Sequence, residues 1–231
     1  NKIMDDVRDE LSSDDPDFEA ARKQFDRIEE IKFLDVTCGS GSFLIKAYDQ
    51  IVECYEEFKE LVQNAKEGGS LTSFSSAQTL PSDYKQRILQ NNLYGVDLDY
   101  QATEIASVNL LLKGLEKNEK LPTILEDNIK KGNSLLNGES EEVAKLLDVS
   151  VEEAEKMGAF NWKNEFGEVF DENNGFDVIA GNPPWGADIE NIASWIENDD
   201  YGFKLASGQY DSYELFIELG ESVLTNGGTL G

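Results

Sequence analysis

Short apolar runs alternate with longer segments of helical periodicity along this chain, and this alternation limits its fold more than any other feature. The runs have the length and the flanking turn residues of buried strands. Strands are expected at 33–36, 93–97, 129–132 and 176–180, and helices at 18–28, 43–61, 82–91, 105–112 and 213–224. This pattern predicts the α/β class, with a doubly wound, mostly parallel sheet whose ligands bind beyond the carboxyl ends of the strands.

The chain divides into a short N-terminal part and one main domain. Residues 1–30 are expected to form a helical segment, and residues 31–231 a single α/β domain. Gly and Ser residues at 65–82 predict a mobile loop. The acidic, helix-prone stretch at 138–172 is long for a connection in a compact domain, so we expect an insertion there.

Two local signals mark the ends of elements. Asp15 and Pro16 predict a capped start for the first helix, with Pro at its first position. Gly227 and Gly228 predict a turn toward a strand that the sequence barely begins, so the sheet is expected to be incomplete at its C-terminal edge.

The residue types present exclude several kinds of chemistry. The chain has no His and only two cysteines, Cys38 and Cys54, which excludes a Cys/His zinc site and a disulfide framework. We therefore expect no metal. Catalysis must use backbone groups, amides, carboxylates or a cofactor. No apolar run reaches the length of a membrane span and no secretory signal is visible, so a cytoplasmic protein without a membrane partner is expected.

The net charge is strongly negative. Asp and Glu number 47 against 20 Lys and Arg, for a formal net charge of -27. Such a surface repels a polyanion, whereas nucleic-acid binding needs clustered basic residues. Either the protein works in molar salt, where repulsion is screened, or a basic recognition domain lies outside this sequence. We favour the first hypothesis, a halophilic protein, because the acidic excess runs through every segment.

A glycine-containing turn follows the first expected strand. Residues 35–43 read Asp-Val-Thr-Cys-Gly-Ser-Gly-Ser-Phe, a strand end followed by Gly-x-Gly and a helix start. Glycines let the backbone approach a ligand closely, and a helix N-terminus offers free N–H groups to a carboxylate or phosphate. The third Gly of a dinucleotide fingerprint is replaced by Leu44, which disfavours NAD.

An acidic residue ends the second expected strand, in Gly95-Val96-Asp97-Leu98-Asp99. A carboxylate at this place can accept the two hydroxyl groups of a ribose. Together with the glycine turn, Asp97 indicates a cofactor that contains a nucleoside.

The sequence Asn182-Pro183-Pro184-Trp185 follows the clearest expected strand. An amino group on an aromatic base is a poor nucleophile because its lone pair is delocalised into the ring. If the Asn182 side-chain oxygen and the Pro183 carbonyl accept its two N–H groups, the nitrogen becomes more tetrahedral and its lone pair can attack an electrophile. The prolines stiffen the loop, and Trp185 offers a stacking face to a flipped-out base.

These motifs, in this order, resemble the amino-methyltransferases of DNA. Lys131-Gly132-Asn133-Ser134-Leu135-Leu136 and Phe160-Asn161-Trp162 add to the resemblance, which covers roughly residues 31–231. The similarity is strongest to type IIG restriction-modification enzymes and to the adenine methyltransferases of phage-resistance systems. It implies a Rossmann-like fold, S-adenosylmethionine as cofactor, and methylation of the exocyclic N6 amino group of adenine in double-stranded DNA, bound through a recognition domain outside this sequence.

The resemblance also implies which residues do the work. The target adenine would be held by Asn182, Pro183, Pro184 and Trp185. The cofactor would be held by Asp35, Thr37, Cys38, Gly39, Ser40, Gly41, Phe43, Asp97, Leu98, Asn133 and Ser134. Val36-Thr37 stands where the family more often has Pro-Ala.

Alternatives remain open at this point. Methylases of protein glutamine also use Asn-Pro-Pro-aromatic loops, but they are compact and lack a long acidic insertion. A cytosine amino-methyltransferase commonly has Ser in place of Asn182. A subunit that keeps the fold without activity is the alternative from a different class, and the all-round negative charge favours it.

Overall fold

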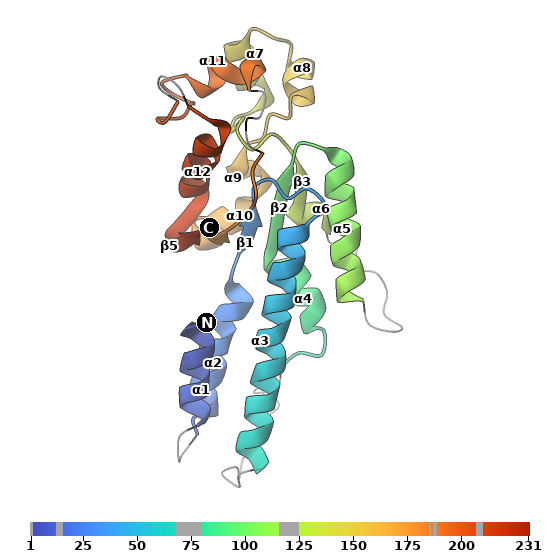
Figure 1. Ribbon diagram of the computed structural model, residues 1–231, viewed down its shortest axis with the longest axis vertical. Coiled ribbons are helices and arrows are strands. Elements are labelled where there is room, and N and C mark those ends of the chain that lie inside the picture. Colours follow the sequence, from blue (N-terminus) through green and yellow to red (C-terminus); the bar gives the residue numbers. More distant parts are fainter. Residues whose placement is uncertain are drawn as a thin grey trace.

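The structure, a computed structural model, describes residues 2–12, 16–67, 80–115, 125–184, 186, 189–206 and 210–231. A five-stranded sheet with the order β3-β2-β1-β4-β5 forms its centre, and all neighbouring strands are parallel. The strands are β1 (Phe33–Asp35), β2 (Leu93–Asp97), β3 (Ile129–Lys131), β4 (Phe176–Ile179) and β5 (Leu224–Leu230). The prediction of a doubly wound, parallel α/β fold is confirmed (Figure 1).

Helices cover both faces of this sheet. The first face carries α1 (Lys2–Leu11), α2 (Phe18–Glu30), α3 (Ser42–Glu67), α4 (Tyr84–Asn91) and α5 (Tyr100–Gly114), with α6 (Leu125–Asn128) leading into β3. The second carries α7 (Ser140–Leu147), α8 (Val151–Lys156), α9 (Trp162–Glu165), α10 (Gly167–Asn173), η2 (Glu190–Ile192), α11 (Ala193–Ile196) and α12 (Ser212–Val223). Successive strand residues alternate between two cores: Leu93 packs in the first, and Tyr94 in the second.

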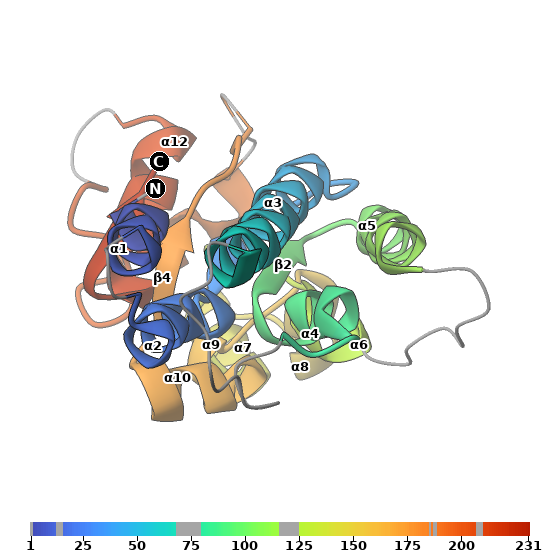
Figure 2. The same ribbon diagram turned by 90° about the horizontal axis from the view of Figure 1, so that it is seen from below.

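The N-terminal helices pack on the long helix α3, at the end of the molecule far from α7 and α8 (Figures 1 and 2). The Phe25 ring meets the Tyr55 ring edge to face at 4.8 Å. The helix α2 begins at Phe18 and its N-cap is Asp17, whose carboxylate accepts the Ala20 N–H at 2.9 Å. The prediction of Pro16 as its first residue is therefore wrong, because the nearer carboxylate caps the helix.

The connection between β3 and β4 supplies the aromatic part of the second core. Phe160, Trp162 and Phe166 are buried there, and Phe176 at the start of β4 packs against Trp162 and Phe166. The acidic stretch predicted at 138–172 thus contributes buried side chains to the sheet face. The loop predicted at 65–82 falls largely on 68–79, which lie outside the described residues.

Strand β5 corrects the prediction of a turn at Gly227 and Gly228. The two glycines lie inside the strand, where the ladder with β4 is irregular: Phe176 pairs with Leu224, and Val178 with Thr229. A Cβ on Gly228 would be 2.9 Å from the Asp177 carbonyl oxygen. Gly228 therefore marks a close approach of two backbones within a bulged ladder, whereas Gly227 is distinguished by its φ of +85°.

Candidate functional site

The carboxyl ends of β1 and β4 lie side by side at the centre of the sheet. From β1 the chain crosses to β2 and β3, and from β4 it continues to β5 on the other side. The strand order reverses here, and open α/β sheets bind their ligands at such a switch point. The glycine turn leaves β1 and the Asn-Pro-Pro loop leaves β4, so the fold brings both motifs to one place.

The glycine turn is built from backbone contacts. The Cys38 N–H donates to the Val96 carbonyl at 2.9 Å, and the Gly41 N–H donates to the Cys38 carbonyl at 2.8 Å. Gly39 and Gly41 have φ values of +50° and +87°, which favour glycine. A Cβ on Gly41 would be 3.1 Å from Ala106, whereas one on Gly39 would meet nothing within 4 Å. The backbone is therefore closely packed at Gly41 and has free space beside it at Gly39.

The Asp97 carboxylate, at the end of β2, is hydrogen-bonded to the glycine turn. Its Oδ2 accepts the Gly39 N–H at 2.8 Å, and its Oδ1 accepts the Asp99 N–H at 2.9 Å. Each carboxylate oxygen can accept a further hydrogen bond, so Asp97 keeps capacity for a pair of hydroxyl groups. Leu98 beside it is 52% exposed, and Phe43 at the start of α3 is 43% exposed. Both leave an apolar face open to a ligand.

Asp35 and Thr37 lie under the start of the Asn-Pro-Pro loop. Asp35 is 1% exposed, and its Oδ1 accepts the Thr37 N–H at 3.1 Å. A Cβ on Gly181 would be 2.5 Å from the same Oδ1 and 3.7 Å from the Thr37 hydroxyl. The Thr37 hydroxyl is buried and has no hydrogen-bond partner among the described residues. Only glycine at position 181 allows the two motifs to come this close.

Electrostatics at this point favour a cation. Burial raises the pKa of Asp35 to about 6, the Thr37 N–H lowers it, and the Asp97 charge raises it further. Burial also raises the pKa of the Cys38 thiol, with the charges of Asp35 and Asp97 adding to the effect, so this thiol is no nucleophile at neutral pH. A positive charge bound beside Asp35 would favour the ionised form of this carboxylate.

The loop itself presents unused acceptors. Asn182 is exposed and Pro183 is half-buried. Within the part of the chain that the structure describes, the Asn182 amide and the Pro183 carbonyl have no hydrogen-bond partner, whereas the Pro184 carbonyl accepts the Ser212 hydroxyl at 2.9 Å. Trp185 lies outside the described residues.

The two residues predicted after β3 take different positions. The Gly132 N–H donates to the Asp97 carbonyl at 2.8 Å, which brings Asn133 beside Asp97. The Asn133 Oδ1 accepts the Leu135 N–H at 3.1 Å. Ser134 is buried, and its hydroxyl donates to the Val36 carbonyl at 2.6 Å. The structure thus brings Asn133 to the site and directs the Ser134 hydroxyl into the core. Ser40 is exposed beside the turn.

Two contacts of the loop were not predicted. Ser212 and Asp211, at the start of α12, bond to the Pro184 carbonyl and the Gly186 N–H. The sequence carries a weak signal for them, because Asp211 and Glu214 have the spacing of a capping box, and the structure contains that box. The signal marks a helix start but gives no indication of what lies against it.

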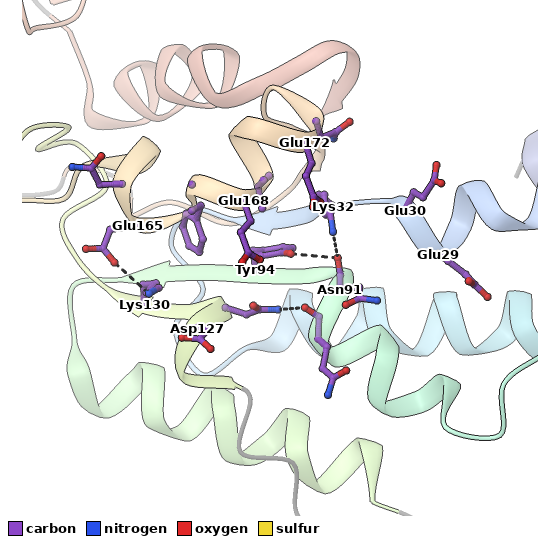
Figure 3. A pocket seen from close by; sticks show the side chains of 17 residues that line it. Glu29, Glu30, Lys32, Asn91, Tyr94, Asp127, Lys130, Glu165, Glu168 and Glu172 are labelled. Atoms are coloured by element: carbon purple, nitrogen blue, oxygen red, sulfur yellow. Dashed lines mark hydrogen bonds and ion pairs between the residues drawn. The ribbon is translucent and has the colours of Figure 1, made fainter.

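A cavity of about 1010 Å³ lies at the other end of the sheet, where the strands begin. Figure 3 shows Lys32, Asn91 and Tyr94 in its wall, with Glu165 bonded to Lys130 at 3.3 Å. Burial raises the pKa of Tyr94 to about 12. None of the residues predicted for cofactor or base lines this cavity. This cavity therefore lies apart from the predicted chemistry.

Across the described ranges, no group of three or more His, Cys, Asp or Glu could hold a metal ion. No described helix is long and apolar enough to cross a membrane.

The residues present fit a cationic amino acid joined to a nucleoside. The Asp35 and Asp97 carboxylates suit a positive charge and a pair of hydroxyl groups, and the open side of Gly39 leaves room above the turn. The buried Thr37 hydroxyl lacks a partner that a ligand could supply. The N–H groups of the first three residues of α3, residues 42–44, have no intrahelical acceptors and suit a carboxylate.

A doubly wound parallel sheet with these motifs at its switch point defines a Rossmann-like methyltransferase fold. Comparison with known proteins specifies the family: the model of the Eco57I restriction-modification methylases matches residues 91–231, and the chain belongs to this family. It is 34% identical over 212 residues to the type II restriction enzyme and methyltransferase RM.Eco57I of Escherichia coli, a match that covers 87% of this chain and 19% of that protein.

Two further relatives are named adenine-specific methyltransferases. The adenine-specific methyltransferase BrxX of an Escherichia coli strain is 30% identical over 93 residues, covering 40% of this chain and 6% of that protein. The adenine-specific methyltransferase PglX of Lacticaseibacillus casei is 29% identical over 94 residues, covering 41% and 6%. The chain thus spans at most about a fifth of the length of these relatives.

Proposed function

We propose that this chain is the catalytic part of a methyltransferase that uses S-adenosylmethionine to methylate the exocyclic amino group of adenine in DNA, within a restriction-modification or phage-defence system. The observation that carries the proposal is the close approach of Gly181 to the Asp35 carboxylate, which brings the Asn-Pro-Pro loop next to the glycine turn. The relatives support adenine as the target, because two of them are adenine-specific methyltransferases by name.

On the base side, Asn182 and Pro183 act as acceptors. Asn182 is exposed, and its amide oxygen and the Pro183 carbonyl are available to the two N–H groups of a flipped-out adenine. Their alignment draws the nitrogen lone pair out of conjugation and directs it toward the turn at 38–41. No proton needs to be removed before the attack, which agrees with a chain that contains no His. As the new N–C bond forms, the C–S bond of the sulfonium would break to leave a neutral thioether, and the methylated nitrogen would then lose one proton to water.

On the cofactor side, S-adenosylmethionine supplies an electrophilic methyl group when bound. Asp35 would pair with the ammonium group and Asp97 would accept the ribose hydroxyls, while Leu98 and Asn133 would lie beside the adenine ring. Gly39 and Gly41 keep the turn clear of side chains. The chain's contribution is orientation and exclusion of water, which account for large rate effects when two reactants are aligned.

DNA binding would require more than this chain. With a net charge of -27, the phosphate contacts that supply non-specific affinity are expected from a basic recognition domain outside this sequence. The Asn-Pro-Pro loop would then meet a base that the recognition domain has positioned.

The test is Asn182→Ala in the full-length protein. We expect methyl transfer from labelled cofactor to unmethylated DNA to fall about 10²-fold or more, because one aligned acceptor is lost, while calorimetry gives an unchanged cofactor Kd. Asn91→Ala is the matched control, an exposed asparagine at the opposite end of the sheet. Mass spectrometry of the digested DNA identifies the product. Transfer by Asn182→Ala at the wild-type rate, or a product other than N6-methyladenine, would refute the proposal.

A further inference from the structure

The Asn-Pro-Pro loop is held at its far end by helix α12. We propose that Ser212 is a positioning residue for the base-binding loop: by bonding the Pro184 carbonyl it fixes the direction of the Pro183 carbonyl, the acceptor for the target amino group. This inference rests on the proposed function and adds to it a residue outside the motifs of the sequence.

The geometry at α12 is specific. Ser212 is 2% exposed, and its hydroxyl oxygen lies 2.9 Å from the Pro184 carbonyl and 3.2 Å from Asp211 Oδ1. A serine hydroxyl has one proton, so the shorter contact to Pro184 takes it. Asp211 Oδ1 also lies 3.4 Å from the Gly186 nitrogen. The N-terminus of α12 therefore contacts the loop at two backbone groups.

The near end of the loop is fixed to β1. The Ala180 N–H donates to the Leu34 carbonyl at 3.0 Å, which extends the pairing of β4 with β1. One residue later, Gly181 packs against the Asp35 carboxylate. Asn182 and Pro183 are thus the short span between two fixed points.

Two consecutive prolines couple the direction of the Pro184 carbonyl, which Ser212 bonds, to the direction of the Pro183 carbonyl. The Pro184 ring fixes the φ angle that lies between the two carbonyls, so ψ of Pro184 is the one freely variable backbone angle between them, and the following proline also restricts ψ of Pro183. When Ser212 sets the direction of the Pro184 carbonyl, the Pro183 carbonyl loses most of its remaining freedom. The bond also occupies the Pro184 carbonyl, which leaves Pro183 as the free proline acceptor for the base.

The experiment compares three variants of the full-length protein. Ser212→Ala removes the hydroxyl, Ser212→Thr keeps it, and Ser222→Ala removes a serine hydroxyl from the other end of α12, where it bonds only to the Leu219 carbonyl in the described structure. Steady-state transfer to unmethylated DNA gives kcat and KM, calorimetry gives the cofactor Kd, and crystal structures give the loop position.

We expect Ser212→Ala to lower kcat roughly 10- to 100-fold, because a displacement of about 1 Å is enough for such a loss. KM for DNA and the cofactor Kd should stay within about twofold, since the groups that bind are intact. Ser212→Thr should recover most of the lost rate, and Ser222→Ala should retain the wild-type kcat. The crystal structure of Ser212→Ala should show the Pro183 carbonyl displaced.

The inference is overturned if Ser212→Ala has a wild-type kcat, if Ser222→Ala is equally slow, or if the cofactor Kd of Ser212→Ala rises as much as its kcat falls. Failure of the proposed function looks different: Asn182→Ala would then be as active as the wild type, or the wild type would transfer no methyl group. In that case an unmoved loop in the crystal structure of Ser212→Ala still contradicts the anchoring role.

Discussion

Replacing Asp35 by Asn should make the protein more stable at neutral pH and remove a specific pH dependence. Asp35 is 1% exposed, and burial with the nearby Asp97 charge raises its pKa to about 6. An aspartate in the unfolded chain has a pKa of about 3.9. The folded protein therefore holds this proton more tightly than the unfolded chain does, and the ionised form is costly to bury.

The sign follows from proton binding. Between about pH 4 and pH 6 the folded state binds more protons at Asp35 than the unfolded state, so stability falls as pH rises. The contribution is complete below about pH 4 and is lost above about pH 6. A difference of about two pKa units corresponds to about 3 kcal/mol at 1.36 kcal/mol per unit. Asparagine retains an acceptor for the Thr37 N–H and has no charge to bury.

Urea unfolding from pH 4 to pH 8 measures this effect. The free energy of unfolding of Asp35→Asn minus that of the wild type should rise by about 3 kcal/mol across this range. The many other carboxylates titrate in both proteins and cancel in the difference. Asp171→Asn, at an exposed position, is the matched control and should show no such rise. A difference that stays constant with pH would refute the reasoning.

The same carboxylate links pH to cofactor binding. If Asp35 pairs with the ammonium group, the proton competes with the cofactor, and wild-type affinity should increase as pH rises from 5 to 7. Asp35→Asn should bind weakly over this whole range. Calorimetry at a series of pH values checks both statements, and a wild-type affinity independent of pH would argue against the pairing.

Two further predictions concern the ribose contact and the surface charge. Asp97→Ala should weaken cofactor binding about 10- to 100-fold by calorimetry, because it removes the proposed acceptor of the hydroxyl pair and the partner of the Gly39 N–H; unchanged affinity would indicate a fold without a working site. Stability against urea should increase from 0.1 M to 2 M KCl, because salt screens the repulsion among the carboxylates that give the net charge of -27; greatest stability at low salt would contradict the halophilic hypothesis.

The sequence was sufficient to predict the sheet's first four strands and the place of the motifs. The strand at 176–179 was visible because β-branched and aromatic residues form an apolar run next to turn residues. Once strands and helices alternate, the doubly wound rule places Asp35, Asp97 and Asn182 at the same edge, with no knowledge of their contacts. Local signals and this topological rule together were enough to predict that these residues lie at the same edge of the sheet.

What could not be predicted depends on partners that are distant in sequence. Strand β5 forms through Gly227 and Gly228 because β4 lies beside it, and pairing overrides their turn signal. Ser134 has the pattern of a site residue, yet its hydroxyl bonds to the Val36 carbonyl 98 residues away. In the sequence, Ser212 can be recognised only as the first residue of a helix, because its bond to the Pro184 carbonyl joins residues that are distant along the chain.

A strongly acidic chain is compatible with the proposed reaction because the carboxylates of the site lie on one side and the neutral acceptors lie on the other. The carboxylates of Asp35, which is buried, and Asp97, which is hydrogen-bonded, lie on the side proposed for the cofactor, where a cation would be held. The side proposed for the base offers a neutral amide and a neutral carbonyl, at Asn182 and Pro183, and neutral acceptors are hardly affected by salt. Salt would therefore act on the encounter with DNA phosphates and leave the alignment of the amino group intact. A strongly acidic surface then weakens the association with DNA without changing how the loop aligns the amino group. The repulsion between this surface and the phosphates must be offset by the basic surface that contacts the duplex.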